Sequence, residues 1–333
     1  MKSILRDFST AFLLGFAIPC FLLSIAVLHQ QEHNAGMLQE TVNTEPEEVP
    51  AGNIVWLHQE DGTIAVDLDT YLIGVLLAEM PVSFEQEALK AQAVASRTYA
   101  RKAYATGGKH GDGSVCTDPS CCQAYMAPEV YLQMGGTAEG VEKATAAVQD
   151  TAGLVLHYGE ELIEATYFSC SGGRTEAAVE VWGVDYAYLQ SVASPGEENA
   201  RYYTDTVLLS PVELTEQLCM EPEGEPEHWI ALTEYSEGGS VRKMVIGDRV
   251  FSGTQLRTLL GLRSTAFEIV PVEEGFQITT RGYGHRVGMS QYGAEAMAAG
   301  GSSFQEILSH YYPGTCLAWL APDYEGDLTV QRE

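Results

Sequence analysis

The chain contains few basic residues for its size. Of its 333 residues, 18 are Lys or Arg and 46 are Asp or Glu, which gives a formal net charge of −28. Binding to a nucleic-acid backbone or to an anionic lipid surface requires a broad positive patch. The composition therefore argues against both roles, and we expect no nucleic-acid partner.

The sequence also lacks several enzyme motifs. It has no HExxH pattern, no Walker phosphate loop and no GxSxG nucleophile elbow, which argues against metalloprotease, nucleotide-hydrolase and α/β-hydrolase activities. We expect no organic cofactor. With 45 % hydrophobic and 19 % charged residues, the chain has a globular composition. Its length predicts two ordinary domains, or one large domain with an insertion.

A long apolar segment lies at the N-terminus. Residues 8–28 carry no charge, and as a helix they would span roughly 30 Å, the thickness of a bilayer core. Lys2 and Arg6 precede this segment and acidic residues follow it, so the positive-inside bias leaves the rest of the chain outside the cytoplasm. We expect residues 1–28 to form a cytoplasmic tip and a retained transmembrane signal anchor. A cleaved signal peptide is the alternative.

The rest of the chain divides by composition. Residues 29–52 are acidic and carry two prolines, which is typical of a flexible stalk. Residues 53–320 alternate strand-like and helix-like patterns and predict an α+β domain of mixed sheet and helix, outside the cytoplasm. Within it, residues 200–265 hold a PEGEPEH loop and two expected helices, and they predict a smaller inserted subdomain. We expect residues 321–333 to be a C-terminal tail.

Local patterns predict the main elements of the folded part. Strands are expected at 64–68, 153–158, 164–168 and 276–279. Helices are expected from a capping box at Ser83 to Gly107, at 290–299, after a second capping box at Ser303, and near 211–219 and 254–260.

One carboxyl group ends an apolar run. In residues 71–81, Glu79 is flanked by Leu77, Ala78 and Met80, and desolvation by such neighbours raises the pKa of a carboxyl group. A group that holds its proton near neutral pH can act as a general acid. The alternative is that Glu79 caps or pairs with the following helix.

Five of the 18 basic residues lie in one stretch of twenty residues, 90–109, which covers most of the following helix and its end. Lys90, Arg97 and Arg101 recur at intervals of seven and four, so they share a helix face, and Lys102 and Lys109 follow. This local positive charge is suited to an anionic substrate group or to orienting the candidate acid. A solvated helix face paired with acidic residues is the alternative.

A short loop carries candidate metal ligands. His110, Cys116, Cys121 and Cys122 match a Cys3His zinc site in ligand type, and Asp112 or Asp118 could orient the imidazole. Four protein ligands close the coordination sphere, so we expect a structural zinc ion. The alternative is a disulfide between Cys116 and one of the two neighbouring cysteines, since thiols pair outside the cytoplasm.

Two glycine-rich stretches, 167–175 and 282–293, place hydroxyl, amide and aromatic groups together. Such groups line sugar-binding clefts. The alternatives are that these stretches are only turns and that His285 is a structural hydrogen bonder.

These segments resemble the stage II sporulation protein D family, which shares its domain with the LytB amidase enhancers. The resemblance rests on YLIGVLLAEMPVSFEQEALKAQAVASRTYA (71–100), CCQAY (121–125), YFSCSGGRTEAAVEVWG (167–183), SGTQLRTLLGLRS (252–264), and GYGHRVGMSQYGAEAMAAGG with EILSHYYPGT (282–315). The segments occur in family order and cover most of residues 55–320.

The resemblance implies a lytic transglycosylase, a carbon–oxygen lyase that cleaves peptide-denuded peptidoglycan strands at MurNAc–GlcNAc bonds and forms 1,6-anhydro-MurNAc during forespore engulfment. It makes Glu79 the acid and aligns Lys90 and Arg97 with the family's basic residues; either could bind the lactyl carboxylate of the substrate. The residues expected to bind the glycan are Ser169, Ser171, His285, Ser290, Gln291 and Tyr292.

The family also implies a location and partners. These are the mother-cell membrane, with the catalytic domain facing the intermembrane space, an amidase (stage II sporulation protein P) and a membrane scaffold (protein M). Some members carry zinc on a loop like 110–122, often with histidine where Cys121 stands. The sequence departs from the family pattern at Arg286, where glycine is usual, and at Cys170, where threonine is common. A non-catalytic amidase enhancer and a water-activating zinc hydrolase are the competing functions.

Overall fold

A computed structural model describes residues 53–60 and 62–320, and it confirms the mixed α+β class. Within these residues, no helix is both long and apolar enough to cross a bilayer. The expected anchor, stalk and C-terminal tail lie outside the described residues.

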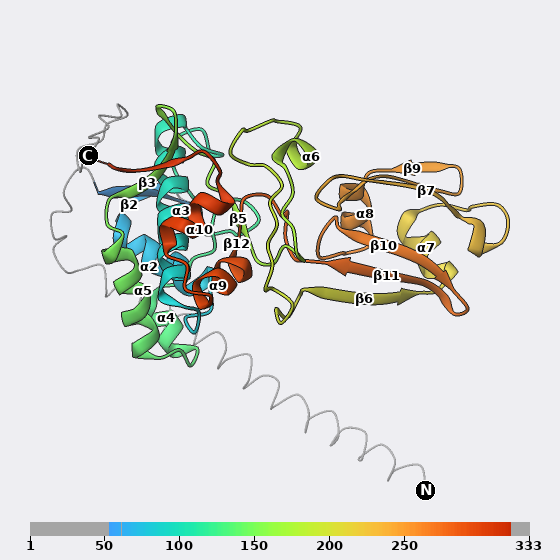
Figure 1. Ribbon diagram of the computed structural model, residues 1–333, viewed down its shortest axis with the longest axis horizontal. Coiled ribbons are helices and arrows are strands. Elements are labelled where there is room, and N and C mark those ends of the chain that lie inside the picture. The colour runs from blue at the N-terminus through green and yellow to red at the C-terminus, as the bar shows by residue number, and fades with distance from the viewer. Residues whose placement is uncertain (1–52, 61, 321–333) are drawn as a thin grey trace, which may run out of the picture. The chain divides into compact units, whose positions relative to one another are not determined.

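Most of the described helices belong to the part of the chain before residue 151 or the part after residue 290 (Figure 1). They are α2 (Leu68–Glu79), α3 (Gln86–Thr106), α4 (Pro128–Gln133), α5 (Ala138–Asp150), α6 (Ala178–Trp182), α7 (Pro211–Leu218), the 3-10 helix η1 (Pro226–His228), α8 (Gly253–Leu259), α9 (Gln291–Ala299) and α10 (Phe304–Tyr311).

The strands form several small sheets. The antiparallel sheets have the orders β1-β2, β13-β3-β4, β10-β11-β6 and β7-β8-β9, whereas β12 and β5 pair in parallel. The strands are β1 (Ile54–Gln59), β2 (Gly62–Asp67), β3 (Leu154–Tyr158), β4 (Glu161–Leu162), β5 (Tyr167–Phe168), β6 (Thr204–Leu209), β7 (Ile230–Tyr235), β8 (Val241–Ile246), β9 (Arg249–Phe251), β10 (Phe267–Val272), β11 (Gly275–Arg281), β12 (Met289–Ser290) and β13 (Cys316–Trp319).

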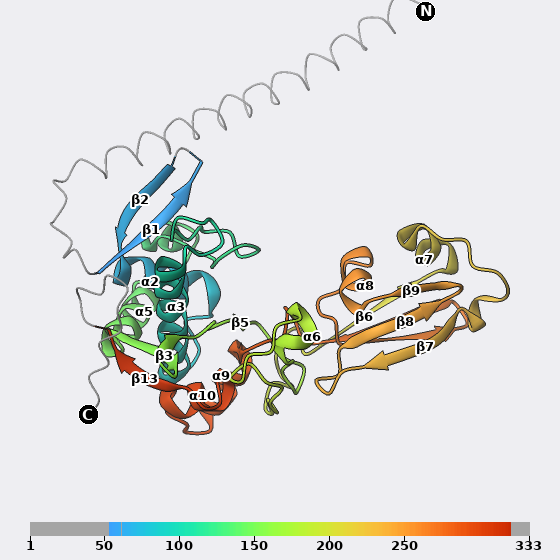
Figure 2. The same ribbon diagram turned by 90° about the horizontal axis from the view of Figure 1, so that it is seen from above.

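The first hydrophobic core is built around α3. This helix contacts α2, α5, α9, α10 and β3, and Figures 1 and 2 show it between these elements in both views. Its alanine-rich sequence allows close approach on several sides, and most of its residues are buried. Segments from both ends of the folded part therefore share one core.

A second cluster of buried hydrophobic residues extends from Leu214 to Ile278. It lies under β10-β11-β6 and β7-β8-β9 and includes α7 and α8, both of which begin with complete capping boxes. This core therefore uses strands that follow the stretch 200–265. The boundaries of an inserted subdomain stay a prediction.

Several expected elements are confirmed and others are wrong in detail. A capping box at Ser303 begins α10 as expected, and α3 ends at Gly107, whose φ of 89° is left-handed. The helix expected near 211–219 is α7. The capping box expected at Ser83 is wrong, because α3 begins at Gln86 after Glu85, which has no side-chain cap. The strand expected at 164–168 is reduced to β5, and the one expected at 64–68 ends at Asp67, which caps α2.

Candidate active site

A cavity of about 640 Å³ contains the candidate acid. Its walls come from the end of α2, from the loop before α4, from β5 and the residue after it, from the end of α6, and from the segment before α9. Its lining is mixed polar and aromatic: Ala78, Glu79, Tyr99, Lys109, Pro119, Ser120, Cys121, Cys122, Gln123, Ala124, Thr166, Tyr167, Phe168, Ser169, Trp182, Tyr283, Gly284, His285 and Gln291. Glu79 is the one Asp or Glu among these lining residues.

Glu79 is held in the cavity because α2 ends there. Pro81 disfavours helical geometry at the residue before it, and Met80 is extended, with φ of −126° and ψ of 143°. The final helical residue is therefore Glu79. The rest of α2 is apolar and largely buried, which fixes the helix and so the position of this carboxyl group.

Two hydrogen bonds hold the Glu79 carboxyl group. Its Oε1 accepts from the backbone N–H of Ala124 at 2.7 Å, and its Oε2 accepts from Nε2 of Gln291 at 3.3 Å. Burial raises the pKa of Glu79, while these two bonds lower it, and the net shift is upward. The alternative that Glu79 caps the following helix is not what these contacts show.

The segment that supplies the Ala124 N–H is fixed against α2. Gly74 has no side chain, and this allows the ring of Tyr125 to lie against it; a Cβ there would overlap the ring. The carbonyl of Gly74 accepts from the backbone N–H of Met126 at 3.0 Å. Gln123 is buried and bonds the hydroxyls of Tyr71 and Tyr167.

Gln291 reaches Glu79 through a pairing between distant segments. Strand β12 pairs in parallel with β5, with Met289 opposite Tyr167 and Ser290 opposite Phe168. Ser290 then caps α9 by accepting from the N–H of Gly293 at 3.2 Å. Gln291 is therefore the first residue of α9 and faces the cavity.

Aromatic side chains make up much of the cavity wall. Trp182 and Tyr283 are 42 % and 39 % exposed, so part of each side chain is open to a ligand. His285 contacts the rings of Phe168 and Trp182, and burial with the nearby charge of Arg257 lowers its pKa to about 4. His285 is therefore neutral at pH 7. Sequence reasoning missed Trp182 and Tyr283, although Tyr283 lies in the glycine-rich stretch 282–293 and Trp182 lies in the family segment 167–183.

Of the expected glycan-binding residues, the structure brings Ser169, His285 and Gln291 to the cavity. Ser171 is fully buried and donates to the carboxylate of Glu197 at 2.9 Å. Ser290 is also buried. The Ser171 hydroxyl belongs to a buried hydrogen-bond network, and the Ser290 hydroxyl caps α9.

Tyr292 lies outside the cavity lining and contacts Phe84 edge to face, with ring centroids 5.1 Å apart. Its backbone N–H donates to the carbonyl of Ser169 at 3.0 Å. It therefore supports the wall without lining it.

Arg97 and Lys90 are not brought to the cavity. Arg97 is 1 % exposed, and its guanidinium donates to the carbonyls of Thr151 at 2.7 Å and Val148 at 3.0 Å, at the C-terminal end of α5. It thereby caps α5, where cations are favourable.

Lys90 bonds Glu87 at 3.0 Å and Asp150 at 3.1 Å. Its ammonium group is therefore paired with acidic residues at the start of α3 and the end of α5. The shared helix face that the sequence predicted exists, but it is covered by other protein elements.

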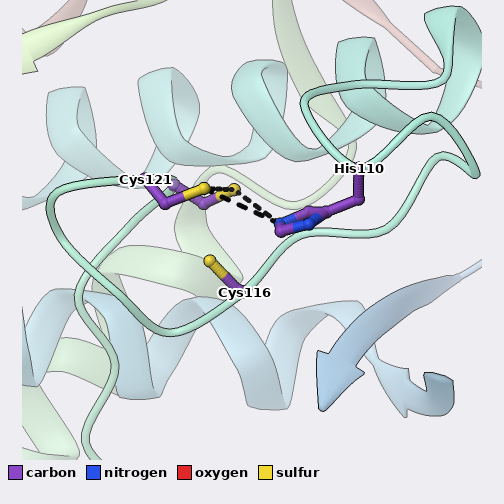
Figure 3. Close-up of side chains that lie close together, drawn as sticks. His110, Cys116 and Cys121 are labelled. Carbon is purple, nitrogen blue, oxygen red and sulfur yellow. Dashed lines mark hydrogen bonds between the residues drawn. The ribbon is translucent and has the colours of Figure 1, made fainter. Parts of the chain in front are cut away.

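The candidate metal ligands converge (Figure 3). Ligand atoms of His110, Cys116, Cys121 and Cys122 all lie within 4.8 Å of one another. His110 Nε2 is 3.8 Å from Cys121 Sγ and 3.6 Å from Cys122 Sγ, and the two sulfurs are 3.8 Å apart. A tetrahedral zinc site with ordinary bond lengths keeps its ligand atoms about 3.5–3.8 Å apart. The donor set and its spacing therefore fit a metal ion.

The loop itself brings these ligands together. Gly113 N–H bonds the carbonyl of Gly107 at 2.9 Å, and Val115 pairs with β1. Asp112 and Asp118 accept from serines two residues on, whereas the His110 ring stacks on His58 at 4.3 Å. All cysteines in the described residues are free thiols.

Arg286 and Cys170, the two departures from the family pattern, both face the interior. Arg286 has a left-handed φ of 65°, is 2 % exposed, and donates to the carbonyls of Ser171 and Gly238 and to the hydroxyl of Ser240. It joins the β7-β8 turn to the glycine-rich segment. The thiol of Cys170 donates to Glu197 at 3.1 Å.

These features define a mixed α+β protein with one carboxyl group in a polar and aromatic cavity beside a His/Cys cluster. A family model described as SpoIID, Stage II sporulation protein, matches residues 58–158. Stage II sporulation protein D of Bacillus amyloliquefaciens is 36 % identical over 292 residues, covering 86 % of this chain and 84 % of that protein. The protein of the same name from Bacillus subtilis (strain 168) is 34 % identical over 280 residues, covering 83 % and 80 %.

The chain belongs to the stage II sporulation protein D family, as the resemblance in the sequence predicted. It is also 30 % identical over 299 residues to the amidase enhancer of Bacillus subtilis (strain 168), covering 74 % of this chain and 40 % of that protein.

Proposed function

We propose that this protein is a lytic transglycosylase that cleaves peptide-denuded peptidoglycan strands at MurNAc–GlcNAc bonds during sporulation. The observation that carries the proposal is the single carboxyl group of Glu79, whose pKa is raised by burial in a cavity with aromatic walls. Most glycoside hydrolases need two carboxyl groups, because the second one activates water or acts as the nucleophile. A transglycosylase uses a hydroxyl of its own substrate, so one group is sufficient.

In the first half of the reaction, protonated Glu79 donates to the oxygen that leaves C1 of the muramoyl residue. Oε1 accepts from the fixed Ala124 N–H, so the proton is carried by Oε2, beside Gln291. The raised pKa keeps this proton available at a higher pH than an exposed glutamate would allow.

In the second half, the Glu79 carboxylate takes the proton of the muramoyl 6-hydroxyl as that oxygen bonds to C1. This closes the 1,6-anhydro ring and returns Glu79 to its protonated form, so no water is consumed. The amides of Ala124 and Gln291 stabilise the transient carboxylate.

The remaining cavity groups hold the glycan. The exposed parts of the Trp182 and Tyr283 rings are suited to contact the apolar faces of pyranose rings. Ser169 and neutral His285 supply hydrogen bonds to sugar hydroxyls.

The His/Cys cluster would hold a structural zinc ion. Bound there, zinc would supply crosslinking of the loop 110–122, because four protein ligands leave no open position for water. Cys122 is followed directly by Gln123 and Ala124, so fixing this loop also fixes the N–H that bonds Glu79. These ligands do not support the water-activating zinc hydrolase.

We also propose the cellular setting that the family implies. Residues 8–28 anchor the chain in the mother-cell membrane, residues 53–320 face the intermembrane space, and an amidase and a membrane scaffold act with it. The second candidate function, a non-catalytic amidase enhancer, is favoured by the similarity to the amidase enhancer.

The test incubates peptide-free glycan strands with the native protein and with Glu79→Gln, and it measures both soluble products and stimulation of a purified cell-wall amidase. We expect the native protein to release anhydro-muramoyl products, and Glu79→Gln to reduce release by about 1,000-fold, because general acid–base catalysis contributes about 100- to 10,000-fold. Amidase stimulation without release by the native protein would favour the enhancer.

A further inference from the structure

We propose that Lys109 recognises the free carboxylate of the muramoyl lactyl group and so makes the cavity selective for peptide-denuded glycan. The inference rests on the proposed function and names the specificity-determining residue of the same site. The observation behind it is that Lys109 lines the cavity that holds Glu79.

Lys109 is the one Lys or Arg among the described residues that line this cavity. His285, the other basic side chain there, is neutral at pH 7. The basic residues that the sequence analysis favoured are committed elsewhere, Lys90 to two carboxylates and Arg97 to the end of α5. In a chain with a net charge of −28, an anionic ligand is repelled unless a cation faces it.

The local structure holds the Lys109 side chain without using all its donors. Helix α3 ends at Gly107, and Lys109 follows in the loop that carries His110. The side chain is exposed, and Nζ donates to the carbonyl of Cys121. An ammonium group has three N–H donors, so Lys109 can keep this bond and still bind a ligand. Prior ordering of a long side chain lowers the entropy that binding costs.

The chemistry of the glycan explains the selectivity. A peptide-free lactyl group ends in a carboxylate, whereas a peptide-bearing one ends in a neutral and bulkier amide. Lys109 forms a charged hydrogen bond with the first and gains little from the second. A charged hydrogen bond of this kind changes affinity by about tenfold.

The test compares two glycans on the full-length protein carrying Glu79→Gln, so that binding is measured without turnover. One is a peptide-free strand and the other is the same strand with its lactyl carboxylates converted chemically to methylamides. We expect calorimetry to give about tenfold tighter binding of the carboxylate strand. Adding Lys109→Gln should remove this preference, and Lys109→Arg should keep most of it.

Lys90→Gln is the matched control, because it removes the same charge outside the cavity. The inference is overturned if Lys109→Gln keeps the preference, or if Lys90→Gln removes it. Lys109 is exposed, so unfolding is not expected to obscure the result.

Failure of this inference is distinguishable from failure of the proposed function. Release of anhydro products by the native protein, with a binding preference that does not depend on Lys109, refutes the inference alone. A preference that depends on Lys109 in a protein that never releases these products supports the inference and refutes the transglycosylase.

Discussion

Replacing Arg97 by lysine separates a structural role from a substrate-binding role for this residue. The guanidinium donates to the carbonyls of Thr151, Val148 and Leu154 at 2.7, 3.0 and 3.4 Å, and it lies 3.5 Å from the carboxylate of Asp69. Lysine keeps the charge but replaces this planar fork with a single point of donation.

The magnitude follows from the bonds that lysine cannot make. A hydrogen bond from a charged group contributes about 1.5–3 kcal/mol, and Arg97→Lys loses about two of them, in a site that is 1 % exposed. We expect the free energy of unfolding to fall by about 4 kcal/mol and the melting temperature by about 10 °C. The folded fraction should keep glycan cleavage within about twofold, because Arg97 does not line the cavity.

Thermal and urea denaturation measure the loss of stability. Glycan cleavage measures the activity, in an assay kept about 20 °C below the melting temperature of the variant so that the protein stays folded. Arg242→Lys is the control: this residue pairs with Glu180 on the surface, where an ion pair contributes about 0–1 kcal/mol. A variant Arg97→Lys that is as stable as the native protein but inactive would refute the structural role.

Three further predictions concern the metal cluster, the acid and Arg286. Zinc at about 1,000 times its Kd should stabilise the protein by about 4 kcal/mol in thermal scans. Cys116→Ser should abolish this gain, and Cys219→Ser should keep it, because Cys219 is an exposed thiol outside the cluster. Equal gains in the two variants would contradict the zinc site. Because the pKa of Glu79 is raised, kcat/KM should fall as the pH rises through that raised pKa. Glu79→Gln should be more stable than the native protein above the raised pKa, but not below the pKa of a glutamate in the unfolded chain. A pH profile of kcat/KM like that of an exposed glutamate would contradict the raised pKa. Arg286→Gly removes a strained left-handed φ of 65° but loses the bonds to the β7-β8 turn, so urea denaturation should show a net loss of about 3 kcal/mol, and a stable variant would be the contrary result.

Elements defined by local signals were predictable from the sequence. The cap at Ser303 and the stop at Gly107 depend only on neighbouring residues, and both are present. The start of α3 was not predictable in this way. The backbone N–H of Glu85 bonds the carboxylate of Glu295, 210 residues away, and this tertiary contact replaces the cap that Ser83 would have provided.

The candidate site also combines features that local sequence encodes with features that depend on tertiary contacts. The apolar run before Pro81 predicted a desolvated Glu79, and burial does raise the pKa of this group. The sequence did not predict that this run forms helix α2, and the burial is partly tertiary, because Glu79 bonds Gln291, 212 residues away. The spacing of Lys90 and Arg97 gave a shared face but not what covers it, and α5 covers it. Trp182 comes to the cavity through tertiary packing that no local pattern encodes.

In the proposed mechanism, Glu79 transfers the proton and the substrate's own 6-hydroxyl closes on C1. The most direct test is mass spectrometry of peptide-free strands cleaved by the native protein in water enriched in the heavy oxygen isotope. We expect muramoyl ends that are lighter than hydrated ends by one water and carry no heavy oxygen, and we expect Glu79→Gln to lose these products. Hydrated ends that carry heavy oxygen would contradict it, because they would require a water nucleophile.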